Sequence, residues 1–159
     1  MHQAKDTLGN AYTVSHDASV TQMAHIIDAY LGSQATVMPL LDELLLTEPS
    51  MPMAICLRTY LLKLGSDPRL ATPIQRGLDS LTALADSLNP REKMHLQALT
   101  SWVGNQLLAT VETLEAILAS YPRDMLALRL AHYLHFYAGS ANNMRASVTR
   151  SLNNWAPAD

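Results

Sequence analysis

Four glycines divide this chain into units of nearly constant length, and this spacing constrains the fold more than any other feature. They lie in the stretches AYLGS, LKLGS, SWVGN and FYAGS, at Gly32, Gly65, Gly104 and Gly139. The intervals between them are 33, 39 and 35 residues. In three of the stretches an aromatic residue lies two positions before the glycine: Tyr30, Trp102 and Tyr137. A period of this length is typical of proteins built from stacked supersecondary units.

Helical periodicity and prolines complete each unit. Apolar residues recur at helical spacing, whereas alternating strand-like runs do not occur, so we predict helices and no strands. The predicted helices cover residues 16–31, 36–47, 51–64, 69–87, 90–103, 106–120, 124–138 and 141–153. Prolines follow the glycines after 17 or 18 residues, from Gly32 to Pro49, Gly104 to Pro122 and Gly139 to Pro157.

Each glycine is expected to end the first helix of a pair and to let the second helix approach closely. The proline then ends the second helix. The resulting unit of about 34 residues matches the tetratricopeptide repeat. The unit after Gly65 departs from the pattern, because SDPRLATP and a longer helix follow that glycine, which we interpret as an insertion between helices.

Several helix starts carry capping residues. In SLNPRE, Asn89 and Glu92 match a capping box, and Pro90 suits the first helical position. Ser50 precedes Pro52 in the same way. Three further side chains are predicted to cap or stabilise helix N-termini: Asp17, Asp67 and Asp124.

Composition limits the range of partners and compartments. The chain has 159 residues, of which 48% are hydrophobic and 16% charged, so residues 1–159 can form a single domain with a buried core. The formal charge of −3 and the scattered Lys and Arg residues argue against nucleic-acid and membrane partners.

The polar segment 1–14 lacks the apolar region of a signal peptide, and no apolar stretch is long enough to span a membrane. The single cysteine, Cys56, lies in an apolar helical run and is expected to be a buried, inert thiol. We therefore expect a cytoplasmic protein.

Longer stretches carry a resemblance to a known family. They are NPREKMHLQALTSWVGN, LEAILASYPRDMLALRLAHYLHFYAG and MRASVTRSLNNWAP, with DTLGNAYTVSHDA near the start. Through them the chain resembles the N-terminal part of the tetratricopeptide repeat protein 38 family over nearly its whole length. The resemblance implies an all-α fold of tetratricopeptide-like repeats. Family members continue past the tryptophan matched by Trp155 through further repeats, so it also implies that the chain corresponds to only the first part of such a protein.

The predicted architecture is a right-handed α-solenoid of about four stacked helix pairs, with the first helix of each pair on the concave face. With Gly139 at the last turn, Arg129, Tyr133 and Phe136 face that side, and Trp102 joins them from the preceding pair. An arginine among aromatic residues is a composition suited to peptide binding. We predict a non-enzymatic scaffold that binds a protein or peptide through these residues. The alternative is that Phe136 and Trp102 only pack between units.

Two histidines on one helix raise the question of a metal or catalytic site. His132 and His135 are three residues apart and share a helix face. The residues between them, Tyr133 and Leu134, do not supply the glutamate of a zinc-binding H-E-x-x-H motif. We therefore predict packing roles for both histidines, and no catalytic residue, cofactor or metal. A small-ligand or metal-dependent enzyme or accessory protein using His132 is the alternative.

The last predicted helix carries an apolar stripe of Met144, Val148 and Leu152, with Trp155 near it. A repeat array needs polar terminal surfaces, because an apolar end face would remain exposed. If the protein ends at Asp159, few following helices cover this stripe. We therefore expect a homodimer through the C-terminal helix as a further hypothesis, in which the protein is a structural oligomerisation subunit.

Overall fold

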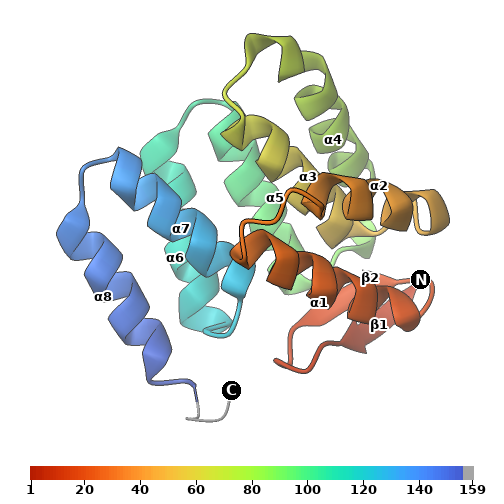
Figure 1. Cartoon of the computed structure of the whole chain (residues 1–159), viewed down its shortest axis with the longest axis horizontal. Helices are drawn as coiled ribbons and strands as arrows, with labels where there is room; N and C mark the ends of the chain where they lie inside the picture. The colour runs from red at the N-terminus through yellow and green to blue at the C-terminus, as the bar shows by residue number, and fades with distance from the viewer. Residues whose placement is uncertain (156–159) are drawn as a thin grey trace.

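The protein begins with a β-hairpin and continues as a chain of α-helices (Figure 1). The computed structural model describes residues 1–155. The two strands of the hairpin are β1 (His2–Lys5) and β2 (Ala11–Val14). The helices are α1 (Ala18–Leu31), α2 (Val37–Thr47), α3 (Pro52–Leu64), α4 (Ala71–Ala83), α5 (Pro90–Val103), α6 (Leu107–Ser120), α7 (Met125–Tyr137) and α8 (Ala141–Leu152). Short 3-10 turns flank α4, namely η1 (Pro68–Leu70) and η2 (Ala85–Ser87). The predicted all-helical character is confirmed for these segments, while Pro157 lies outside the described residues.

Neighbouring helices pack against each other along the whole chain. Contacts join α1 to α2, α3 to α4, α5 to α6 and α7 to α8, so each predicted pair is present. The pairs are connected through α2 with α3, α4 with α5 and α6 with α7, and α3 also contacts α5. In addition, α1 packs against α7, so the first and last pairs of the described chain touch each other (Figure 1).

The N-terminal hairpin was not expected, and the prediction that the chain has no strands is wrong for segment 1–14. His2 pairs with Val14 and Lys5 with Ala11 in an antiparallel register. Strand β1 is largely exposed, whereas Tyr12, Thr13 and Val14 are buried where β2 contacts α1 and α3. Each strand has four residues, too few for alternation to stand out. Tertiary contacts, rather than local propensity, define this element.

The first helices of three pairs end in the same arrangement, a Schellman motif. In each motif a backbone amide donates to the carbonyl five residues earlier. The pairs are Gln34 to Ala29, Gln106 to Ser101 and Ser140 to His135. The left-handed residue of the motif is Ser33, Asn105 or Gly139, with φ of 55°, 58° and 68°. Glycine therefore occupies the left-handed position only in the last turn.

The expectation that these glycines admit a close second helix is wrong at Gly104. A Cβ atom there would meet only the carbonyls of Thr100 and Ser101, in its own helix, at 3.4 and 3.5 Å. A close helix approach occurs instead at Gly77 in α4, which the repeat pattern did not single out. A Cβ atom on Gly77 would lie 2.0 Å from Oγ1 of Thr59 in α3. Only a residue without a side chain lets α4 pack on α3 at this distance.

Three of the predicted caps are confirmed. The side chain of Asn89 accepts from the amide of Glu92, whose own side chain accepts from the amide of Asn89, which completes the capping box at α5. Asp67 accepts from the amide of Arg69, and Asp124 from that of Ala127 at the start of α7. These bonds satisfy amides that a helix N-terminus otherwise leaves unpaired.

Two of the predicted capping residues do not cap. Ser50 is not adjacent to the helix, because Met51 precedes Pro52 at the start of α3 and makes no side-chain capping bond. The carboxylate of Asp17 is exposed and lies 2.6 Å from Nε2 of His2. The segment that leads into α1 is bound instead by Glu48, a buried residue that follows α2.

Glu48 accepts hydrogen bonds from the amides of Ser15 and His16, at 2.5 and 3.3 Å, and from the hydroxyl of Ser19. Burial alone would raise the pKa of Glu48, but the bonds from Ser19, Ser15 and His16 outweigh it and lower the pKa to about 2. The carboxylate thus joins the end of α2 to the start of α1.

Candidate functional site

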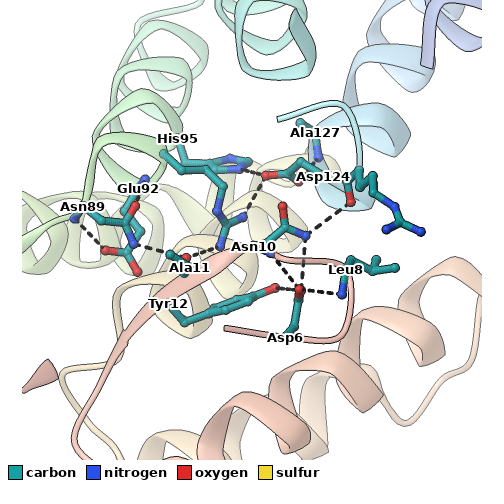
Figure 2. Close-up of polar contacts among 12 residues, drawn as sticks. Asp6, Leu8, Asn10, Ala11, Tyr12, Asn89, Glu92, His95, Asp124 and Ala127 are labelled. Carbon is teal, nitrogen blue, oxygen red and sulfur yellow. Dashed lines mark hydrogen bonds and ion pairs between the residues drawn. The ribbon is translucent and has the colours of Figure 1, made fainter. Parts of the chain in front are cut away.

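A buried polar cluster connects the hairpin to α5 and α7 (Figure 2). Nη1 of Arg91 lies 2.7 Å from Oδ2 of Asp124, and Nε2 of His95 lies 2.9 Å from the same oxygen. The hydroxyl of Tyr60 donates to the backbone carbonyl of His95 at 2.9 Å. The guanidinium of Arg91 also covers the ring of Tyr12, 4.6 Å from its centroid. Arg91 and His95 reach Asp124 together because they are one turn apart on α5.

The same helix binds the backbone of strand β2. The carbonyl of Ala11 accepts from Nη2 of Arg91 at 2.8 Å and from Nδ2 of Asn89 at 3.1 Å. The carboxylate of Glu92 accepts from the amide and hydroxyl of Thr13, at 2.8 and 2.6 Å. Side chains at the start of α5 therefore bind mainly the backbone of strand β2.

Asp6 organises the turn between the two strands (Figure 2). Its carboxylate accepts from the amides of Leu8 and Asn10 and from the hydroxyl of Tyr12, at 2.8 to 3.2 Å. Nδ2 of Asn10 then donates to the carbonyl of Arg123 in the α6–α7 connection, at 3.3 Å. The hairpin is thus held at both its turn and its second strand.

The chemistry open to this cluster is limited by its burial. Burial alone would raise the pKa of Asp124, but the neighbouring His95 and Arg91 lower it well below its ordinary range. Burial raises the pKa of Tyr60 and that of Cys56 well above their usual values. Cys56 is a free, buried thiol as predicted. His95 is fully buried, and the contacts of Arg91 and His95 join α5 to strand β2 and to the start of α7.

A groove on the surface offers a binding site of different character. It has a volume of about 720 Å³, within the range of ligand-binding sites. Its walls come from the end of α3, the α3–α4 connection, the start of α4, the region of the α5–α6 turn and α7. The apolar side chains of these walls include Leu62, Ile74, Trp102, Tyr133 and Tyr137. Polar groups border them, with Nζ of Lys63 3.0 Å from Oδ1 of Asn105.

Three of the four predicted binding residues meet in a second, smaller hollow between α7 and α8. Arg129, Tyr133 and Phe136 line it together with His132 and Met144, and its volume is about 200 Å³. The fourth residue, Trp102, lines the larger groove with only its edge, because it is 8% exposed and packs on Tyr60 with ring centroids 5.8 Å apart.

Tyr133 belongs to both hollows and therefore connects them. Its ring lies 4.6 Å from that of Tyr137, and the ring of Phe136 meets Tyr137 edge-on at 5.8 Å. Burial and the neighbouring Tyr137 raise the pKa of Tyr133 to about 12, so this phenol is neutral at physiological pH. Phe136 and Tyr137 are 67% and 65% exposed. Sequence reasoning used Tyr137 only as a repeat marker and missed it as a surface residue, although its spacing of four from Tyr133 places both on one helix face.

The two histidines of α7 have different surroundings. His135 is buried, and its Nε2 lies 2.9 Å from Oε1 of Glu115 in α6. The other oxygen of Glu115 accepts from Nη2 of Arg150 in α8 at 2.8 Å, so this carboxylate ties three helices together. His132 lines the hollow between α7 and α8. Among residues 1–155, no three His, Cys, Asp or Glu side chains are grouped as ligands of a metal ion.

The apolar stripe of α8 has only partial cover. Ser147 and Ser151 are the buried residues of this helix, whereas Met144 and Val148 are half-buried and Leu152 is 61% exposed. The ring of Trp155 lies under the guanidinium of Arg123, which is 5.0 Å from its centroid. None of the helices in residues 1–155 combines the length and the apolarity that crossing a membrane requires.

No protein-family model matches the chain, and no solved structure matches it either.

Proposed function

We propose that this protein is a non-enzymatic helical-repeat scaffold that binds a segment of another protein along α7. The observation that carries the proposal is the cluster of Tyr133, Phe136 and Tyr137, which borders a groove of about 720 Å³. Aromatic side chains are enriched among the residues that dominate binding energy at protein interfaces. Exposed apolar side chains that gather beside a groove mark interaction surfaces, whereas isolated ones need no explanation.

The repeat architecture belongs to this proposal. We infer that the four helix pairs form a tetratricopeptide-like array related to the tetratricopeptide repeat protein 38 family. The spacing of Gly32, Gly104 and Gly139 and the shared Schellman ends of α1, α5 and α7 support it. The β-hairpin and the contact between α1 and α7 are additions to a plain stack, in which each unit touches only its neighbours.

The groove favours an extended peptide over a compact small molecule. Its walls are drawn from connections and helix ends of three successive pairs, so it runs across the array instead of closing into a pocket. The hollow between α7 and α8 continues it through Tyr133. An extended segment could place successive side chains in the two hollows.

Selection from a random library of short peptides displayed on phage tests the proposal, with the full chain immobilised. We expect selected peptides to bind the chain in fluorescence anisotropy. Tyr137→Ala should weaken that binding at least about tenfold, which corresponds to about 1.4 kcal/mol. Tyr137 is largely exposed, so its removal should leave the unfolding midpoint nearly unchanged.

Leu46→Ala serves as the matched control, because it removes an exposed apolar side chain of α2 that lines neither hollow. Peptide binding that Tyr137→Ala and Leu46→Ala reduce equally would contradict a site on α7. Failure to select any binding peptide would count against the scaffold proposal as a whole.

Self-association through α8 is a second candidate, favoured by the exposure of Leu152. Light scattering at roughly tens of micromolar protein, the concentration range in which weak homodimers form, distinguishes the monomer from the dimer. A dimer that Leu152→Ser converts to monomer would support it, and a monomer at all concentrations would exclude it.

A further inference from the structure

The helix pair α7–α8 differs in charge from the rest of the protein. Residues 1–124 contain eight Lys and Arg against thirteen Asp and Glu, a formal charge of −5. Residues 125–155 contain three arginines, Arg129, Arg145 and Arg150, and no Asp or Glu. The surface proposed above for binding therefore lies on a basic segment of an acidic protein.

Two of these arginines are left without a carboxylate partner. Glu115 of α6 reaches the α7–α8 pair, and it is already bound to His135 and Arg150. Within residues 1–155, no carboxylate lies within ion-pair distance of Arg129 or Arg145, and both are exposed. Arg129 lies close enough to Tyr30 of α1 to oppose the rise that burial causes in the pKa of that phenol.

The position of Arg129 gives this charge a specific use. It lines the hollow of about 200 Å³ together with Tyr133, Phe136 and Met144, and no acidic residue lines that hollow. The hollow is smaller than a typical small-molecule site, so its size suits one side chain of a longer segment. A guanidinium beside an apolar hollow recognises a carboxylate next to an aromatic or aliphatic side chain.

Resting on the proposed scaffold function, we infer that the bound segment is an acidic peptide. It places an aromatic or aliphatic side chain between α7 and α8 and a neighbouring Asp or Glu carboxylate on Arg129. Arg145, next to Met144 in sequence, adds a second positive charge for flanking carboxylates. The charge on both sides is complementary, which favours this partner over a neutral or basic one.

Nucleic acid and anionic membranes fit this surface less well. Binding to nucleic acid rests on many phosphate contacts, and lipid recognition on clusters of four to eight or so basic residues. The pair α7–α8 offers two arginines without carboxylate partners, of which Arg129 lines the hollow and Arg145 follows its lining residue Met144 in sequence. An acidic peptide with an apolar anchor uses both features.

The charge of the peptides selected from the random library tests the inference. We expect enrichment of Asp and Glu beside Phe, Leu or Tyr over the unselected library. A selected peptide should bind more weakly as salt rises, and replacement of its acidic residues by Lys should weaken binding at least about tenfold. The charge reversals Arg129→Glu and Arg145→Glu should remove the preference for acidic peptides. Arg76→Glu, at an exposed arginine of α4, is the matched control and should retain it.

Other outcomes have distinct meanings. Selected peptides that are neutral or basic but still depend on Tyr137 would overturn the acidic ligand and leave the scaffold function standing. Failure to select any peptide would overturn both. Binding of a random-sequence oligonucleotide, or of vesicles containing phosphatidylserine, through the same two arginines without selection of acidic peptides would assign the surface to a different partner and overturn the inference.

Discussion

Arg91 and Asp124 form an ion pair with a nitrogen–oxygen distance of 2.7 Å, and their side chains are only 2% and 1% exposed. The pair of Arg69 and Asp67 has the same distance, but its side chains are 89% and 29% exposed. The two pairs therefore share their shortest nitrogen–oxygen distance, and their surroundings differ. Burial decides the consequence, because a charge that loses its partner away from water has nothing to replace it.

We predict that Arg91→Ala lowers the free energy of unfolding by about 3–5 kcal/mol, the usual cost of removing one member of a buried pair. The substitution removes the positive charge paired with the buried Asp124 carboxylate, which keeps only His95 and the amide of Ala127, and it removes a donor to the carbonyl of Ala11. Urea unfolding followed by circular dichroism measures the loss. Arg69→Ala, at an exposed pair, is the control and should leave the free energy of unfolding nearly unchanged. Equal losses of unfolding free energy in the two variants would show that burial does not increase the contribution of the Arg91–Asp124 pair.

Glu48 is predicted to make stability depend on acid. Its pKa in the folded protein is about 2, below the ordinary 4.5, so the ionised form is the one that stabilises the fold. This contribution is present above pH 4.5 and is lost as the pH falls toward 2. Glu48→Gln should lower stability at neutral pH by about 2 kcal/mol, since it weakens hydrogen bonds to a charged acceptor.

The difference between wild type and Glu48→Gln should then shrink as the pH is lowered through that window. Asp124, whose pKa is also lowered, keeps some acid dependence in both proteins. Thermal unfolding at a series of pH values measures the effect. Glu43→Gln, at an exposed carboxylate of the same helix, should follow wild type at every pH. A constant difference for Glu48→Gln across the window would contradict the assignment.

Gly77→Ala is predicted to destabilise the protein by about 1–3 kcal/mol, although glycine-to-alanine changes within helices usually stabilise. The new methyl group would lie 2.0 Å from Oγ1 of Thr59, so α4 must move away from α3. Denaturant unfolding of the single variants and of Thr59→Ala/Gly77→Ala measures the coupling. The double variant should be more stable than the sum of the two single changes predicts, by about 0.5 kcal/mol or more. Additive changes would rule out this contact as the reason for the glycine.

The repeat glycines are predicted to differ in their tolerance of a side chain. Gly139 has φ of +68°, so Gly139→Ala should cost about 1–2 kcal/mol. Gly139→Asn should cost less, because Asn105 occupies the same position of the preceding repeat. Gly104→Ala should be neutral or stabilising by up to about 1 kcal/mol, since Gly104 has φ of −72°. Thermal unfolding midpoints give the order, and a larger loss for Gly104→Ala than for Gly139→Ala would contradict it.

Part of the candidate site could be predicted from the sequence. Arg129, Tyr133 and Phe136 follow one another at helical spacing, and they do line one hollow. Trp102 was predicted to share that surface, but most of its side chain packs on Tyr60 in the core. The larger groove was not predictable, because its walls come from connections far apart in the chain.

Of the buried polar cluster, only the helix caps could be predicted from the sequence. Asn89, Glu92 and Asp124 each carry a signal that depends on residues within three positions, and that local role is confirmed. The second partners of Asn89 and Glu92 are Ala11 and Thr13, which are 78 and 79 residues away in strand β2, an element that no local pattern predicted. The further partners of Asp124, Arg91 and His95, are 33 and 29 residues away. A carboxylate at a helix start predicts hydrogen bonds to the nearest backbone amides. It does not predict which distant segment of the chain binds its other oxygen.

The helices, the contacts between neighbouring helices and most helix ends could be predicted from local sequence, because helical periodicity, prolines and caps act over a few neighbouring residues. The docking of the hairpin, the glycine that permits close packing and the contact between α1 and α7 could not be predicted in this way. These features depend on contacts between segments distant in the chain, whose free energies appear only once the helices have packed together.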